Sequence, residues 1–356
     1  FFRWLEPLGV RVSLRTAERS EDGFLPLLAG SEEPQILIGT HALLYDKVEV
    51  GEKLGLVIVD EQHKFGVLQR GKLMERGTLP DILVMTATPI PRTLTMTLYG
   101  DLDVSVLNEL PKGRGKIITI VRSANKTPDA AKFLREQVAE GRQAYIVYPL
   151  IDESEKLKLS SARQAFDEWQ ERLGNDITVG LLHGKLSGEE KDAVMEKFRS
   201  NKVQILVSTT VIEVGVDVPN ANTMIIYHAE RFGLAQLHQL RGRIGRGEHK
   251  SYCVLMHTPK HEEAEEKLAI LAETRDGFKI AEADLSRRGP GDVLGTAQSG
   301  LPDLRLAEFL TDAELVQQAR DAAKDILVAD PSLELPEHSG LKTSISQRQG
   351  ALANVS

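Results

Sequence analysis

Short apolar runs alternate with helical stretches along most of the chain. The runs are rich in β-branched residues and nearly all apolar, as is typical of parallel strands covered on both faces. Between them, helices are predicted over Asp129–Glu140, Ala162–Leu173 and Glu189–Arg199. Ser187 and Glu190 form a capping-box pattern ahead of the last helix. This alternation predicts an α/β fold built on doubly wound parallel sheets. The predicted strands are Gln35–Ile38, Leu56–Val59, Ile82–Met85, Ala144–Tyr148, Val179–Leu182, Gln204–Val207, Thr223–Tyr227 and Tyr252–Met256.

Changes in pattern divide the chain into four parts. The Pro/Gly-rich stretch Leu110–Lys116 is typical of a linker between two sheets. A charged helical pattern begins after Pro259 and is followed by the Gly/Pro-rich stretch Arg288–Pro302 and a helix near Asp312–Leu327. We therefore predict domains at 1–110, 111–258 and 259–328, and a tail at 329–356 that we expect to be poorly ordered. The opening Phe1–Leu5 has the pattern of a helix already in progress, so we expect the chain to be a fragment with an incomplete first domain.

Composition narrows the class of protein only slightly. The net charge of −8 over 356 residues argues weakly against a nucleic-acid partner, but an acidic chain can still line one groove with Arg and Lys. The single cysteine, Cys253, lies in an apolar run and predicts a buried structural thiol and a reducing compartment. No apolar run approaches the ~20 residues of a membrane span, so no membrane partner is predicted.

Two acids follow the apolar run Leu56–Val59. Asp60 and Glu61, followed by Gln62 and His63, stand where a parallel sheet places its ligands, at the carboxyl end of a strand. In nucleotide motors such an Asp helps to hold Mg²⁺, and such a Glu polarises the attacking water. The alternative is an acidic turn after a buried strand.

A second strand end carries two hydroxyls, Thr86 and Thr88, on either side of Ala87. Such hydroxyls can bond to the acidic motif and to another domain, and so link nucleotide state to domain closure. A helix N-cap ahead of Pro89 is the alternative.

A third motif spans Ser208–Pro219. The hydroxyls of Thr209 and Thr210 suit contacts to nucleic-acid phosphates. Gly215 permits close backbone approach to a nucleotide, and Asp217 suits a contact to its ribose. A loop stabilised by its own hydroxyls is the alternative, and the pattern leaves both open.

The fourth motif, Gln239–Gly247, places three arginines within six residues, separated by glycines. Three like charges so close together repel one another and would not stabilise an isolated loop. Across a domain cleft, Arg243 and Arg246 would stabilise charge on a transferring phosphoryl group as arginine fingers. The alternative is a basic loop that contacts DNA.

No Gly-x-x-x-x-Gly-Lys-Ser/Thr phosphate cradle occurs in the sequence. Gly113-Arg114-Gly115-Lys116 lacks the required glycine spacing, and Ile117 stands in place of the Mg²⁺-binding hydroxyl. We therefore expect this chain alone to hydrolyse ATP negligibly.

The order of these four motifs resembles that of superfamily 2 nucleic-acid helicases, with Asp60–His63 as the DExH box and Gln239–Arg246 as the Gln-x-x-Gly-Arg-x-Gly-Arg motif. Ile38–Leu44 and Arg231–Arg243 resemble the RecG and Mfd families. Gly289-Pro290-Gly291 and Leu294–Pro302 look like RecG more than Mfd. The resemblance extends over roughly residues 1–327.

The resemblance implies two RecA-like domains that hydrolyse ATP with Mg²⁺, the first one incomplete, and a C-terminal helical hairpin with a Gly-rich loop. It implies translocation on branched duplex DNA, such as stalled forks and Holliday junctions, by a monomer in the bacterial cytoplasm at the nucleoid. An Mfd-type transcription-repair translocase and a nonenzymatic nucleic-acid-binding module are the alternatives; the sequence upstream would separate them. The implied catalytic residues are Asp60 (also the Mg²⁺ ligand), Glu61, Gln62, His63, Gln239, Arg243 and Arg246; the nucleotide contacts are Gly215 and Asp217; the DNA contacts are Thr40, His41, Thr209 and Thr210; and the coupling residues are Thr86, Thr88, Arg288 and Gln298.

Overall fold

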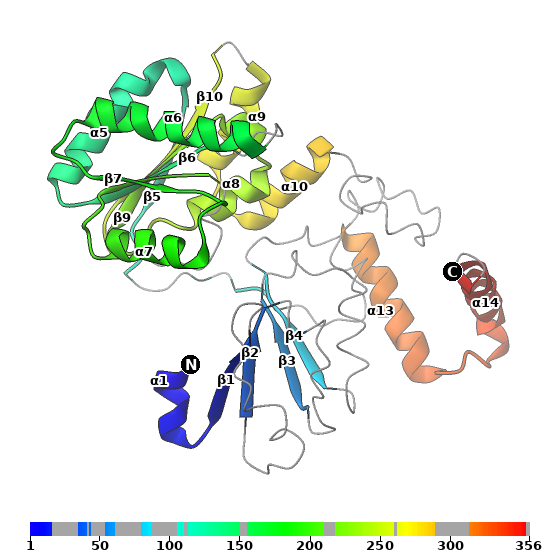
Figure 1. Cartoon of the computed structure of the whole chain (residues 1–356). Helices are drawn as coiled ribbons and strands as arrows, with labels where there is room; N and C mark the ends of the chain where they lie inside the picture. The colour runs from blue at the N-terminus through cyan, green and yellow to red at the C-terminus, as the bar shows by residue number, and fades with distance from the viewer. Residues whose placement is uncertain are drawn as a thin grey trace. The chain divides into compact units, whose positions relative to one another are not determined.

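The computed structural model describes part of the chain. Contacts divide the chain into two units, Phe1–Ala87 and Thr88–Ser356, which are treated separately (Figure 1). Because this division does not test the domain boundaries inferred from the sequence, those boundaries stay a prediction. The described residues are 1–15, 35–40, 43, 54–60, 80–86, 105–107, 109, 113–149, 155–209, 218–259, 262–288 and 313–353.

The first unit contains two pairs of parallel strands. Helix α1 (Phe2–Leu5) and the 3-10 turn η1 (Glu6–Leu8) precede β1 (Arg11–Arg15), which pairs with β2 (Gln35–Gly39). Strands β3 (Leu56–Val59) and β4 (Asp81–Val84) form the second pair. All four run parallel to their partners, as predicted for a nucleotide-binding α/β domain.

The second unit is built on one six-stranded parallel sheet. Its spatial order is β5-β10-β9-β6-β8-β7. Strands that are consecutive in the sequence are joined by crossover connections, as parallel strands require. The strands are β5 (Ile117–Ser123), β6 (Gln143–Val147), β7 (Val179–Leu182), β8 (Ile205–Ser208), β9 (Ala221–Tyr227) and β10 (Ser251–His257).

Alternate residues of the central strands enter two separate cores, one on each face of this sheet. In β6, Tyr145 and Val147 face one core, whereas Ala144 and Ile146 face the other. Helices α5 (Thr127–Ala139) and α6 (Glu155–Leu173) cover the second of these faces, with Trp169 buried against it. The opposite face is covered by α7 (Gly188–Arg199), α8 (Leu234–Arg241) and α9 (Glu262–Glu273). Helices on both faces confirm the doubly wound α/β class.

Cys253 lies in β10, next to the edge strand β5, and is fully buried and free. Burial raises the pKa of its thiol to about 12, although the nearby Arg241 opposes the shift. The prediction of a buried structural thiol is confirmed.

Two consecutive helices, joined by a short turn, follow the sheet. α9 and α10 (Gly277–Arg288) form a hairpin, and Leu268, Leu271 and Ile280 bury it against the sheet's first core. The 3-10 turns η3 (Ala124–Lys126) and η5 (Ala229–Arg231) complete this part of the unit. None of the helices among the described residues has the length and apolar character of a membrane span.

The tail is helical, so the expectation of poor order there was wrong. Helix α13 (Ala313–Ala329) is followed by η6 (Pro336–His338) and α14 (Ser339–Ala353). The reason is a local cap: the Asp330 carboxylate accepts hydrogen bonds from the backbone amides of Glu334 and Leu335 at 2.9 Å and contacts His338 Nδ1 at 2.9 Å. The two hydrogen bonds from backbone amides hold the pKa of Asp330 at about 2, below its ordinary value.

Candidate functional site

The predicted arginine fingers lie on a loop at the amino-terminal edge of the six-stranded sheet. This arginine loop, residues 242–247, follows α8 and returns the chain to β10. Arg243 is half-buried and Arg246 is exposed. Gln239, half-buried, is in the last turns of α8. The structure therefore brings all three predicted residues of this motif into one segment.

Glycines fix the shape of the arginine loop. Gly245 has φ +75°, a left-handed conformation that side chains disfavour. A Cβ there would lie 2.7 Å from Ile117 Cγ1 at the start of β5, and one on Gly247 would lie 2.8 Å from the Pro219 carbonyl oxygen. The spacing of glycines and arginines in the motif thus follows from close packing of the loop against the strand starts.

Arg241, the first arginine of the motif, is a structural brace. It is buried, and its guanidinium donates to the carbonyl oxygens of Leu271 at 2.5 Å and Thr274 at 3.0 Å, at the end of α9. It also bonds to His238 Nδ1 at 3.0 Å, and burial, with help from Arg241, lowers the pKa of His238 to about 4. Neutral His238 therefore accepts a hydrogen bond from Arg241. The Arg241 cation also satisfies carbonyl oxygens at the end of α9 that have no partner within the helix.

The helical hairpin also holds the other end of α8. The N-cap residue is Gly233, which has no side chain to cap the helix. Instead, the Asp284 carboxylate of α10 accepts a hydrogen bond from Leu234 N at 3.1 Å. An anion at the start of α8 and Arg241 at its end tie the arginine-bearing segment to both helices of the hairpin.

Buried polar atoms without hydrogen-bond partners gather at the opposite, carboxyl-terminal edge of the sheet. Among the described residues five such side-chain atoms occur. One, Gln35 Oε1, is in the first unit, and the rest follow or end strands β5, β7, β8 and β9: Ser123 Oγ, His183 Nδ1, Thr209 Oγ1 and Glu230 Oε2. Buried polar groups are nearly always satisfied, so this concentration at one edge is typical of a surface that binds a polar ligand.

Register explains why two of these residues are neighbours. Leu182 of β7 pairs with Ser208 of β8, and Thr209 N donates to the Leu182 carbonyl oxygen at 3.2 Å. His183 and Thr209 therefore leave adjacent strands at the same level. Thr209 was predicted as a phosphate contact, whereas His183 was not predicted. Its signal was its place, directly after the predicted strand Val179–Leu182.

The surroundings of His183 are basic. Burial lowers the pKa of His183, and the nearby Arg163, Lys191 and Lys185 lower it further, while Glu190 opposes them. The imidazole is therefore neutral near pH 7, and it lies in a positive field that suits an anion. A chain that is acidic overall thus carries a local cluster of cations at this strand end.

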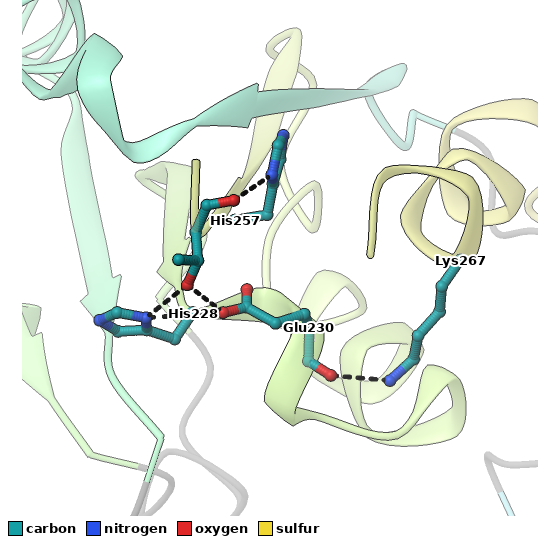
Figure 2. A network of polar contacts seen from close by, with 5 residues as sticks. His228, Glu230, His257 and Lys267 are labelled. Carbon is teal, nitrogen blue, oxygen red and sulfur yellow. Dashed lines mark hydrogen bonds and ion pairs between the residues drawn. The ribbon is translucent and has the colours of Figure 1, made fainter. Parts of the chain in front are cut away.

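A polar network occupies the same edge beside β9 and β10 (Figure 2). Thr258 Oγ1 donates to Glu230 Oε1 at 2.6 Å, and His228 Nδ1 lies 3.6 Å from that oxygen. Burial opposes ionisation of Glu230, but the Thr258 and backbone hydrogen bonds keep its pKa below the ordinary value. Lys267 of α9 donates to the backbone carbonyl oxygens of Glu230 at 2.9 Å and Phe232 at 2.6 Å. The hairpin is therefore joined to the segment between β9 and α8 as well.

In the first unit, the described candidates all follow strands. Asp60 follows β3, and Thr86 follows β4 by two residues, with Met85 N donating to the Val59 carbonyl oxygen at 2.8 Å. Asp60 and Thr86 therefore occupy the same edge of one parallel pair, as predicted for an acidic motif linked to a hydroxyl motif. Thr40 follows β2 in the other pair.

Several predicted residues lie outside the described part of the chain. Arg288 is the last residue of α10, and its side chain is not described. The roles of the remaining residues stay predictions: Glu61, Gln62, His63, Thr88, Gly215, Asp217, Thr210, His41 and Gln298.

Family models place the chain among nucleic-acid motors. The DEAD/DEAH box helicase model matches residues 1–97, and the helicase conserved C-terminal domain model matches residues 125–248. These two models define a helicase motor with two RecA-like domains. A third model, for the ATP-dependent DNA helicase RecG, domain 3, C-terminal, matches residues 274–352. The chain belongs to the RecG family. This last match includes the tail, in which the sequence analysis found no resemblance.

Curated relatives named ATP-dependent DNA helicase RecG agree with this assignment. The protein from Synechocystis sp. is 50% identical over 94% of this chain, and the one from Bacillus subtilis is 47% identical over 97%. The chain spans only 40% and 50% of those two proteins.

A solved structure described as RecG bound to a three-way DNA junction has a TM-score of 0.65 and 42% identity over 88% of this chain, and 41% of that protein is covered. The Mycobacterium smegmatis helicase Lhr, at 20% identity and a TM-score of 0.54 over 77% of this chain and 39% of its own, shares the fold.

Proposed function

We propose that this chain is the motor of an ATP-dependent DNA helicase that acts on branched DNA. The observation that carries the proposal is 47–50% identity to RecG proteins over nearly the whole chain. The related structure with a three-way junction supports branched duplex DNA as the substrate class. The match to the RecG domain 3 model favours this reading over an Mfd-type translocase.

The nucleotide side of the motor uses the first unit and the arginine loop. Asp60 would hold Mg²⁺, Glu61 would polarise the attacking water, and Arg243 and Arg246 would stabilise charge on the γ-phosphoryl group. Asp60 at a strand end and a glycine-shaped loop that presents both arginines support these roles. ATP and Mg²⁺ are the expected cofactors, with Gly215 and Asp217 as further contacts.

The nucleic-acid side uses the carboxyl-terminal edge of the six-stranded sheet. Thr209 and His183 would bond to backbone phosphates, because both carry buried polar atoms without partners in a basic setting. The two functions thus fall on opposite edges of one domain. Thr40, His41 and Thr210 are the further proposed DNA contacts.

Coupling between the two sides is assigned to the hairpin and the segment after it. We expect Arg288→Ala or Gln298→Ala to spare most ATP hydrolysis while impairing fork unwinding. The proposed reason is that these residues bind the hairpin and convert closure of the motor domains into movement along DNA. Thr86 and Thr88 would link nucleotide state to closure. The assay is paired measurement of ATP hydrolysis and unwinding on one preparation; a strictly proportional loss of both activities would reject the assignment.

The enzymatic test uses the intact gene product. We expect ATP hydrolysis stimulated by forked DNA, and Glu61→Gln should abolish hydrolysis while leaving ATP binding largely intact. The 356-residue chain itself should turn over far below ~1 s⁻¹, the low end for working enzymes. An intact product without DNA-stimulated hydrolysis would refute the proposed function. We expect a monomer that resides in the cytoplasm and associates with the nucleoid.

A further inference from the structure

The stretch of chain that leads into β5 runs along the arginine loop. Arg114 Nε donates to the carbonyl oxygen of Gly245 at 3.2 Å, and Gly115 N donates to that of Gly247 at 2.8 Å. One residue later, Ser251 N donates to the Lys116 carbonyl oxygen at 2.9 Å, which begins the β5–β10 ladder. The contacts to Gly245 and Gly247 hold the residue on each side of Arg246, so the backbone of that arginine is fixed from both directions.

The joint is too tight for side chains. A Cβ on Gly115 would lie 1.9 Å from the His249 carbonyl oxygen and 2.7 Å from its carbon, distances that real Cβ atoms do not reach. On the other side, a Cβ on Gly245 would meet Ile117 Cγ1 at 2.7 Å. Only glycine at both positions permits two backbone segments to touch in this way. The Gly113–Lys116 sequence, which is not a phosphate cradle, therefore has a steric requirement of its own.

We propose that Arg114 and Gly115 position the arginine loop for catalysis. The inference rests on the function proposed above. Arg114 is a positioning residue, because its hydrogen bond is to the backbone of Gly245, next to Arg246. Arginine fingers stabilise charge only when their guanidinium is held where charge develops, and a displacement of about 1 Å reduces rates strongly.

Two substitutions of Arg114 separate its hydrogen bond from its bulk and charge. In Arg114→Gln, the amide nitrogen stands as many bonds from the backbone as Arg Nε does, so a donor is kept without the charge. Arg114→Met has similar length and no donor. Gly115→Ala must push the connecting stretch away from the loop, and Gly340→Ala is its control, because nothing lies within 4 Å of a Cβ added there.

The experiment measures kcat and the KM for ATP of the intact gene product at saturating forked DNA. We expect Arg114→Met to lower kcat about fivefold with KM for ATP little changed, because the arginine that the bond positions acts on the transition state more than on bound ATP. Arg114→Gln should restore kcat to within about twofold of the wild type. Gly115→Ala should lower kcat more than Arg114→Met does, and Gly340→Ala should match the wild type.

A double-mutant cycle with Arg246→Ala distinguishes positioning from general destabilisation. If Arg114 acts through Arg246, then Arg114→Met has no further effect on kcat once Arg246 is absent. An equal loss in both backgrounds, or an Arg114→Gln variant as slow as Arg114→Met, would overturn the inference while leaving the proposed function in place. An inactive wild type would refute the proposed function, and the inference with it. Should Gly115→Ala fail to fold, the Arg114 pair decides alone.

Discussion

Arg241 gives the most quantitative test of how the hairpin and the arginine loop are joined. Its guanidinium satisfies the carbonyl oxygens of Leu271 and Thr274, at 2.5 and 3.0 Å, at the end of α9. Arg241→Met removes both bonds, together with the contact to His238, and leaves the two carbonyls without this donor. A hydrogen bond to a charged group contributes about 1.5–3 kcal/mol, and the hydration that the guanidinium regains on unfolding offsets part of the sum. We expect a net loss of about 3 kcal/mol in the free energy of unfolding of the second unit.

The assay is urea denaturation of this chain followed by tryptophan fluorescence. The chain has two tryptophans, and Trp169 is 2% exposed in the core of the second unit, whereas Trp4 is 72% exposed in the native state. The signal change therefore reports mainly the second unit. For an m-value of about 2–3 kcal/mol/M, the midpoint of Arg241→Met should fall by roughly 1–1.5 M urea.

Arg246→Met is the matched control, because Arg246 belongs to the same motif and is exposed. Its midpoint should stay within about 0.3 M of the wild type, since exposed charges contribute little to stability. A shift of Arg241→Met as small as that of the control would refute the assignment of Arg241 as the brace between α8 and α9.

Three further predictions concern individual residues. Gly245→Ala places a side chain at φ +75° and against Ile117, so it should destabilise the second unit by more than about 1 kcal/mol in the same urea assay, and an unchanged midpoint would contradict this. Cys253 is fully buried with its pKa raised to about 12, so a thiol-reactive dye should label it only after unfolding; rapid labelling of the native chain would be the contrary result. Asp330 has a folded pKa of about 2 against an ordinary 3.8, so its contribution to stability is present above pH 3.8 and is lost as the pH falls through 2. Hydrogen exchange of the turn before α14 should therefore differ between wild type and Asp330→Ala above pH 3.8 and converge near pH 2, and equal exchange at every pH would reject the cap.

The central strands could be predicted because they are apolar on both faces. All of the strands predicted from the sequence overlap an observed strand. Two strands among the described residues were missed. Strand β1 has arginines at both ends and a serine at its centre, so its apolar signal is short. Strand β5 begins with a β-branched apolar run, but it directly follows the Gly-rich linker and was not separated from it. Helix α6 begins at Glu155 rather than at the predicted Ala162, since its first turns show little apolar periodicity.

Motif spacing identified the candidate site residues, but it could not separate their structural roles. Arg241, Arg243 and Arg246 look alike in the sequence, and only the packing of Arg241 against the end of α9 separates the brace from the candidate fingers. His183 and Thr209 are brought together by the β7–β8 register, a long-range pairing that local patterns do not encode. No role was predicted for Arg114, which stands in a sequence that only resembles a phosphate-binding loop. Its hydrogen-bond partner, Gly245, lies 131 residues away along the chain, so no local pattern could reveal the contact.

The proposed function assigns a different ligand to each edge of the six-stranded sheet: ATP to the arginine loop at the amino-terminal edge, and DNA to the carboxyl-terminal edge. The most direct test is steady-state ATP hydrolysis by the intact gene product as a function of forked-DNA concentration, for the wild type, Arg246→Ala and Thr209→Val. Arg246→Ala should lower kcat by about 10³-fold at saturating DNA, with little change in the DNA concentration for half-maximal rate. Thr209→Val should raise that DNA concentration and retain most of kcat, because it removes a proposed phosphate contact at the edge of the sheet opposite the arginine loop. If Arg246→Ala hydrolyses ATP normally, or if both variants change the same parameter, the two edges do not have separate functions.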